Sequence, residues 1–105
     1  QVKMIALCEG DTILALKKLS PTRLVRNEFC RAVEEAEARG ATAGELSELL
    51  GRGRSKRGIF DGELTEGELE IGQVASLLRD LPPAGEVVRK LVTEFDAARR
   101  RLAEL

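Results

Sequence analysis

Two stretches of the sequence concentrate charged side chains and glycines, the residue types that could hold an anion or a cofactor. In the first stretch, residues 51–58, Arg52, Arg54, Lys56 and Arg57 are interspersed with glycines. Cations on a glycine-rich loop can bind phosphate groups, because the bare backbone approaches the ligand and its N–H groups donate to it. This segment is therefore a candidate phosphate-binding loop.

The recognised phosphate-binding motifs do not fit this basic segment. A Walker loop needs Lys-Ser or Lys-Thr after its second glycine, and Gly58 is followed by Ile59; the dinucleotide fingerprint needs glycine where Lys56 stands. No aromatic residue interleaves with the cations, and the net charge of −1 gives no general attraction to nucleic acid. A solvated loop is the main expectation, phosphate or cofactor contact comes second, and nucleic-acid binding is least expected.

The second stretch, residues 61–78, has acidic turns punctuated by glycine that lead into an apolar segment. A calcium loop is excluded, because the sixth position from Asp61 is Glu66 where that loop needs glycine. Carboxylates near the start of a helix are favoured by its macrodipole. The pattern predicts a capped helix, with a bare patch at Gly72-Gln73 that another surface can approach closely.

Composition restricts the class of protein. The chain has 105 residues, enough for one domain or part of one, and aromatic residues are only 3%, so the core must be aliphatic. Cys8 and Cys30 lack metal-ligand spacing, and a small disulfide scaffold would carry more cysteines, so a reducing cytoplasm is the expected location. No apolar run approaches membrane-spanning length, so no membrane partner is expected.

The N-terminal part, residues 1–26, predicts the end of a helix followed by short strands. Residues 2–8 have helical spacing of apolar side chains, and a chain that opens inside a helix is expected to be a fragment of something longer. Residues 12–16 are apolar and partly β-branched, which favours a strand. Pro21 excludes a helix at the preceding residue, and residues 22–26 predict a second short extended segment.

Residues 27–51 predict two helices. Asn27 is a good N-cap for a helix that continues to about Arg39. Thr42 and Glu45 have the spacing of a capping box for a shorter helix that ends at Gly51. Residues 52–66 are then expected to form a basic loop followed by an acidic loop.

Residues 67–105 also predict two helices, the last from about Ala84 to Glu104. Its apolar residues recur at alternating spacings of three and four: Val88, Leu91, Phe95, Ala98, Leu102 and Leu105. We expect this seam to pack against the rest of the domain. The alternative is a free-standing interaction module that forms homo-oligomers through Val88, Leu91, Phe95 and Leu102. The predicted fold class is mainly α with one or two short β-strands, in a single helical domain or fragment over residues 1–105.

Four motifs in this order resemble one enzyme family. They are Glu9-Gly10-Asp11-Thr12, the run from Pro21 to Phe29, Asp61-Gly62-Glu63, and Gly67-Glu68-Leu69-Glu70-Ile71-Gly72-Gln73. Their order and spacing are similar to the C-terminal portion of the nitronate monooxygenase family, formerly called 2-nitropropane dioxygenase, which includes the FMN-dependent enoyl-acyl carrier protein reductases. The resemblance covers nearly all of the chain.

The resemblance implies a role as part of a larger flavoprotein oxidoreductase. Family members are FMN-binding (β/α)8 barrels with an added, mostly helical segment at the C-terminal end, and this chain resembles the added segment and lacks the barrel. Active sites of such barrels lie at their C-terminal face, so the segment would be a lid or wall of the active site. The missing barrel would be its partner, and FMN would be bound by the full-length enzyme and not by this chain alone.

The resemblance also implies site residues. Gly67, Gly72 and Gln73 match the family's pattern beside the flavin, whereas Glu68 replaces a serine and Glu70 replaces a methionine. The cofactor-binding residues implied are therefore Gly67, Glu70, Gly72 and Gln73, with a carboxylate at Glu70 where an apolar side chain would face the cofactor. The family's catalytic histidine belongs to the barrel, and this chain has no histidine, so no catalytic residue is assigned and the isolated chain is expected to be inactive.

Overall fold

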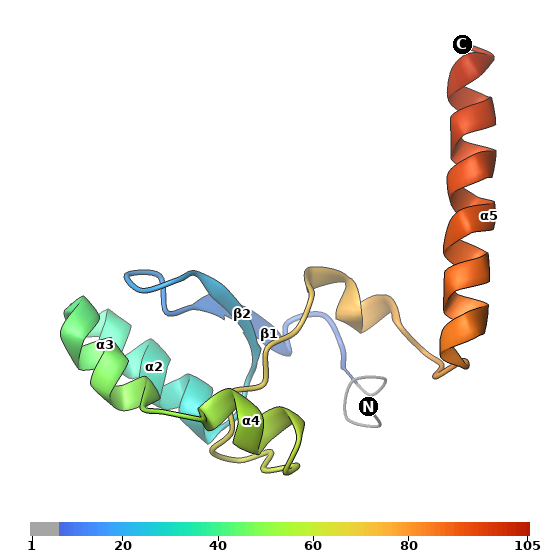
Figure 1. Ribbon diagram of the computed structural model, residues 1–105. Helices are drawn as coiled ribbons and strands as arrows, with labels where there is room; N and C mark the ends of the chain where they lie inside the picture. The colour runs from blue at the N-terminus through green and yellow to red at the C-terminus, as the bar shows by residue number, and fades with distance from the viewer. Residues whose placement is uncertain (1–6) are drawn as a thin grey trace.

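The computed structural model describes residues 7–105, a small sheet with helices beside it and one long helix apart from them (Figure 1). The elements are β1 (Thr12–Ala15), β2 (Thr22–Val25), α2 (Glu28–Ala38), α3 (Ala43–Leu50), α4 (Arg54–Ile59), the 3-10 helix η1 (Gln73–Leu77) and α5 (Ala84–Ala103). The predicted fold class, mainly helical with short strands and no barrel, is confirmed for this part of the chain. Most of the predicted N-terminal helix over residues 2–8 lies outside the described residues, and Leu7 and Cys8, which are described, are not helical.

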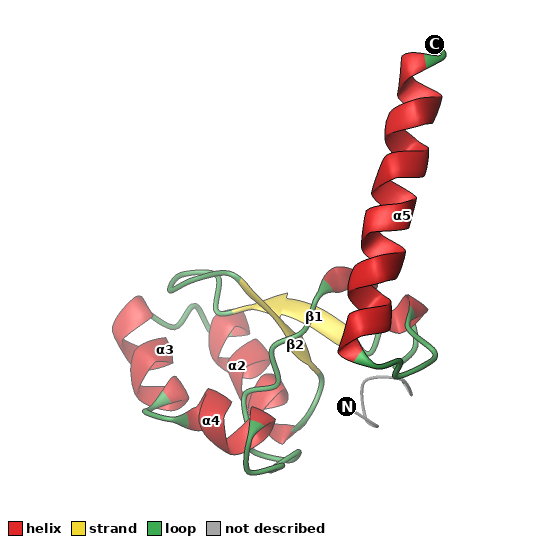
Figure 2. Ribbon diagram, turned by 45° about the vertical axis from the view of Figure 1, so that its right-hand side comes forward, coloured by secondary structure: helices red, strands yellow, loops and turns green. Residues whose placement is uncertain are grey.

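The two strands form an antiparallel hairpin that covers α2. Their register pairs Thr12 with Val25 and Ala15 with Thr22. Two short strands are marginal alone in water. The hairpin lies beside α2 and α3 (Figure 2). Its buried side chains join those of the two helices in one core with a single aromatic ring: Ala15, Leu16, Leu24, Phe29, Cys30, Val33, Ala36, Ala41 and Leu46.

Both predicted N-caps are present. The Asn27 Oδ1 accepts from the Cys30 N–H at 2.9 Å. At the start of α3 the Glu45 N–H donates to Thr42 Oγ1 at 3.2 Å, and the Thr42 N–H donates to Glu45 Oε2 at 2.7 Å, which completes the capping box. These hydrogen bonds hold the pKa of the Glu45 carboxyl below its ordinary value. Short-range sequence signals therefore define both helix starts correctly.

The predicted loop over residues 52–66 is wrong in its first half, which forms α4. Arg54 satisfies carbonyl groups at the end of α3, since its Nε donates to the Leu50 carbonyl at 2.8 Å and its Nη2 to the Leu49 carbonyl at 3.2 Å. Gly53, at φ +72°, lets the chain turn between the two helices. Contacts from elsewhere in the fold thus favour a helix that local propensity does not predict.

Residues 68–71, expected to belong to the acidic turn that leads into a helix near Gly72, instead run extended along β2. The Val25 N–H donates to the Leu69 carbonyl at 3.0 Å, and the Ile71 N–H donates to the Arg23 carbonyl at 3.0 Å. Leu69 and Ile71 alternate with glutamates, a period of two, and pack against a second cluster formed by Leu7, Val25 and Ala75. Only Gln73–Leu77 is helical, as η1.

The long helix α5 buries no residue and stands away from the other elements (Figures 1 and 2). The expectation that its seam packs against the rest of the domain is therefore wrong for the residues described, which leave Leu91 60% and Phe95 67% exposed. In residues 7–105, neither α5 nor any other helix combines the length and apolar character needed to cross a membrane.

Asn27 also joins the acidic turn to the hairpin and α2. Its Nδ2 donates to the Leu64 carbonyl at 2.9 Å and to the Gly67 carbonyl at 2.8 Å, while its Oδ1 caps α2. The Phe29 N–H adds a bond to the Thr65 carbonyl at 3.3 Å. One side chain therefore fixes the start of a helix and the position of a segment that lies far away in the sequence.

Replacing Asn27 separates these two functions. Asn27→Ser keeps an oxygen that caps α2 but removes the amide donor, so we expect a loss of about 1–2 kcal/mol in the free energy of unfolding, from carbonyls left without a donor. Asn27→Ala also removes the cap, at a further cost of about 1 kcal/mol. Urea denaturation measures both losses, and a serine variant as stable as the wild type would show that the amide does not hold the turn.

A matched pair of glycine substitutions tests the packing of the acidic turn. A Cβ on Gly67 would lie 2.2 Å from the Glu63 carbonyl oxygen and 2.4 Å from the Gly58 Cα, whereas a Cβ on Gly72 would meet nothing within 4 Å. We expect Gly67→Ala to lower the free energy of unfolding by about 1–3 kcal/mol through overpacking. Gly72→Ala should stay within about 0.5 kcal/mol of the wild type. Equal stability of the two variants would contradict this packing.

Candidate functional site

The candidate site is a cavity of about 600 Å³ between the hairpin and η1. Residues 8–12, which lead into β1, and Arg23 of β2 form one side of the cavity. Residues of η1 and Arg79, which follows it, form the other side. The polar and charged side chains on its wall include Glu9, Thr12, Arg23, Gln73 and Arg79. The cavity therefore collects residues from both ends of the chain's globular part.

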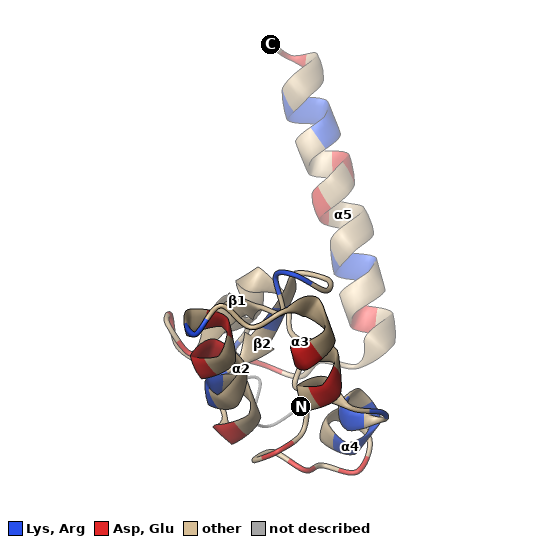
Figure 3. Ribbon diagram, turned by 90° about the vertical axis from the view of Figure 1, so that its left-hand side faces the viewer, with Lys and Arg blue, Asp and Glu red and all other residues tan. Residues whose placement is uncertain are grey.

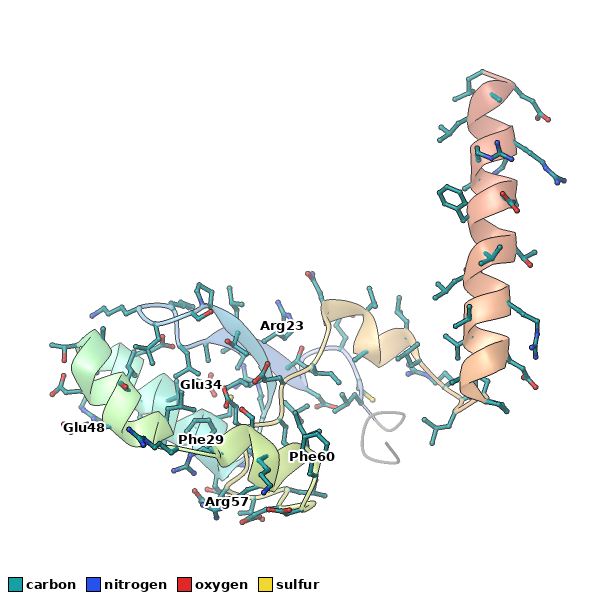
Figure 4. The ribbon with its side chains drawn as sticks, viewed as in Figure 1. Arg23, Phe29, Glu34, Glu48, Arg57 and Phe60 are labelled. Carbon is teal, nitrogen blue, oxygen red and sulfur yellow. The ribbon has the colours of Figure 1, made fainter. Side chains whose placement is uncertain are left out.

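The strand pairing positions the cavity side chains. Arg23 lies on β2 beside β1, and its Nη1 donates to Thr12 Oγ1 at 3.1 Å, which holds the guanidinium along the sheet (Figure 4). The Ile71 N–H bond to the Arg23 carbonyl fixes the segment that leads into η1, so Gln73 follows directly after a paired residue. Gln73 thus lies opposite Arg23 because residues 68–71 extend the sheet.

A second guanidinium borders the cavity after η1. The Arg79 Nη1 donates to the Leu78 carbonyl at 2.9 Å and to the Leu7 carbonyl at 3.5 Å, which ties the end of η1 to the start of the described chain. Guanidinium groups match the geometry of phosphate and carboxylate oxygens. With Arg23, Arg79 and the amide of Gln73 on its wall, the cavity could bind an anionic ligand that also offers polar atoms.

The structure separates the four residues that the resemblance implies for the cofactor. Gln73 lines the cavity, and Gly72 is exposed immediately before it. Gly67 is buried against Gly58 of α4, so the chain's own packing explains its lack of a side chain. Glu70 is exposed and accepts a hydrogen bond from Ser55 Oγ at 3.2 Å.

In the described chain the Glu70 carboxylate is bonded to α4. The bond to Ser55 directs Glu70 toward α4, and Glu70 is not part of the cavity wall. Glu68 is buried, at 6% exposure, and also accepts from Ser55 Oγ. One serine hydroxyl therefore lies between the two carboxylates that distinguish this chain from the family pattern.

The basic residues at 52–57 do not converge on one site. Arg54 is internal, with its side chain 19% exposed, its guanidinium 4.4 Å from the centre of the Phe29 ring and its Nη1 donating to the Glu66 carbonyl at 2.7 Å. Arg57 pairs with Glu63 at 3.7 Å. The N–H groups of Thr65 and Glu66 hold the pKa of the Glu63 carboxyl below its ordinary value, which keeps this partner charged.

Figure 3 shows the cations of α4 beside the acidic turn that follows it. Within residues 7–105, Arg52 and Lys56 are exposed and form no ion pair. The predicted phosphate loop thus includes a helix whose least exposed cation, Arg54, is hydrogen-bonded to carbonyl groups of the chain itself. Of the predicted phosphate-binding residues, none lines the cavity.

Sequence reasoning missed Arg23 and Arg79. Arg23 lies within a run that the family resemblance includes, but a single arginine on a short strand carries no signal of its own. Arg79 follows the segment predicted as a helix, and only the extended course of residues 68–71 brings its end near β2. Recognising the alternation of Leu69 and Ile71 as a strand would have predicted this proximity.

Comparison with known proteins gives a fold match to part of a larger protein. No protein-family model and no curated protein sequence matches the chain. The structure of FabK from Thermotoga maritima matches 97% of this chain with a TM-score of 0.75 and 25% sequence identity, and the match covers 32% of that FabK chain. A mutant form of the same FabK matches 97% of the chain with a TM-score of 0.68 and 23% identity, over 29% of its length. The chain is therefore similar in fold to about a third of FabK.

Proposed function

We propose that this chain is the C-terminal part of an FMN-dependent oxidoreductase of the nitronate monooxygenase type, where it forms a wall of the active site. The observation that carries the proposal is the match to FabK along nearly the whole chain, at a TM-score of 0.75. The order of the sequence motifs supports the same proposal, since it resembles the family that includes the FMN-dependent enoyl-acyl carrier protein reductases. The motif order and the fold match both support this proposal.

The cavity beside η1 fits one edge of a flavin nucleotide. The guanidinium groups of Arg23 and Arg79 suit a phosphate group or a polar ring edge. The Gln73 amide can donate and accept, as the imide edge of a flavin requires. Val74 and Leu77 add an apolar surface to the same wall. FMN, when bound, supplies the hydride chemistry, and these residues bind it, orient it and exclude water.

The outer surface offers a place for the barrel to dock. Phe60 is 81% exposed at the end of α4 (Figure 4), with Ile59 and Leu64 exposed nearby in the sequence. On η1, Val74 is 63% and Leu77 is 74% exposed. Grouped apolar side chains on a surface mark contacts with other protein. A barrel resting on this side would cover these residues and close the cavity.

The chemistry itself belongs to the barrel under this proposal. The chain has no histidine. Ser55 in α4 is bonded to Glu68 and Glu70 and lies outside the cavity wall. The contribution of this chain to catalysis is thus positional, and it comes from Gln73, with Gly72 allowing close approach of the ligand.

Arginine and glutamine variants in the full-length protein encoded by the parent gene test the proposal. We expect that protein to purify with FMN and to oxidise NADH or NADPH, while residues 1–105 alone do neither. Arg79→Ala and Gln73→Ala should each lower flavin affinity or kcat/KM by roughly tenfold or more, because each removes a group that orients the ligand. Flavin fluorescence and steady-state kinetics measure the two effects.

Arg52→Ala is the matched control, since Arg52 is an exposed arginine outside the cavity wall. It should leave flavin affinity and turnover unchanged. A parent protein that binds no flavin would refute the proposed function. If Arg52→Ala lowered flavin affinity or turnover while Arg79→Ala and Gln73→Ala did not, the ligand site would lie at the basic segment instead.

A further inference from the structure

The seam of α5 is an apolar surface that nothing covers in the described chain. Val88, Leu91, Phe95 and Leu102 are between 59% and 70% exposed, and all lie on one side of the helix. Isolated exposed apolar residues are normal, but a continuous stripe along a long helix marks a site of protein contact. The occupant must present a complementary stripe of similar length.

We infer that the occupant is α5 of a second copy of this chain, lying antiparallel. The seam is complementary to itself in this orientation. If Phe95 of one copy faces Ala98 of the other, the same register places Leu91 opposite Leu102 and Val88 opposite Leu105. The largest side chain of the seam then meets the smallest one twice, once on each side of the two-fold axis.

Charge complementarity supports the same register. Glu94 and Arg101 flank the seam on one side, and the antiparallel register places Glu94 of one copy beside the partner's Arg101. Two-fold symmetry produces this pair twice. Both residues lie in the exposed part of α5, where Glu94 otherwise pairs only with Lys90 of its own helix, at 3.8 Å among the described residues.

A parallel pair is disfavoured by the same sequence. It would stack Phe95 on Phe95 and Ala98 on Ala98, which alternates an overfilled layer with an underfilled one. It would also place Arg99, Arg100 and Arg101 of one helix beside the same three arginines of the partner, and like charges in contact are repulsive. The antiparallel arrangement separates the two arginine clusters and also opposes the two helix dipoles.

A groove at the base of α5 borders the seam at Leu91. The groove, of about 610 Å³, lies between the linker and the first turns of α5, and its apolar wall includes Leu78, Leu81, Pro82, Val87 and Leu91. In the antiparallel register the partner's Leu105 lies at the level of Val88, beside this groove. The groove thus extends the apolar contact at each end of the helix pair.

A charge-reversal cycle tests both the contact and its register. Analytical ultracentrifugation of the purified protein at about 100 μM should show a dimer, because the pairing buries the apolar seams of both helices. Leu91→Asp should give a monomer. Glu94→Arg and Arg101→Glu should each weaken the dimer by roughly tenfold, and the double variant should recover to within about threefold, since it restores the pair with its charges exchanged.

Arg100→Glu is the matched control, because Arg100 lies on the side of α5 opposite the seam. It should not weaken the dimer, and it should not rescue Glu94→Arg. Circular dichroism checks that every variant keeps its helix content. A monomeric wild type, a Leu91→Asp variant that still dimerises, or a double variant that is not restored would overturn the inference. None of these outcomes depends on flavin binding, so the proposed function can stand or fail separately.

Discussion

The hydrogen bonds of Asn27 are the constraint on which the rest of the globular part depends. One amide caps α2 and holds the acidic turn through the Leu64 and Gly67 carbonyls. The turn in turn places residues 68–71 along the free edge of β2, with Gly67 packed on Gly58 of α4. The cavity exists only because this segment is fixed there, so a polar residue outside the cavity determines the shape of its wall.

The elements that could be predicted from the sequence are those specified by local interactions. Asn27, Thr42 and Glu45 satisfy N–H groups within their own first turn, so spacing alone identifies them. Helix α4 and the extended segment 68–71 were mispredicted because their partners are distant in the sequence. Arg54 bonds back to α3, and Leu69 pairs with Val25, contacts that no local pattern contains.

The candidate site was predictable only in part, for the same reason. Gln73 was identified through the family resemblance, and it does line the cavity. Arg23 and Arg79 complete the wall through the pairing of residues 69–71 with β2, where the sequence predicts an acidic turn. Gly67 is a cofactor residue only by the family resemblance, and in this structure it packs against Gly58 of the same chain.

We propose two kinds of contact for this chain, one at the cavity beside η1 and one along the seam of α5. The FabK match, which covers 32% of that protein, fits a chain whose globular part rests on a larger neighbour. The seam has the residue sizes and charges of a surface that pairs with itself. Physical separation of α5 from the cavity allows both contacts to form at once.

The most direct measurement is a crystal structure of the full-length protein with its flavin bound. We expect the Gln73 side chain within hydrogen-bond distance, about 3 Å, of the flavin and Gly72 in contact with it. Arg23 or Arg79 should lie beside a flavin oxygen or phosphate. A flavin held elsewhere, with Gln73 and both arginines facing solvent, would contradict the placement of this chain at the active site.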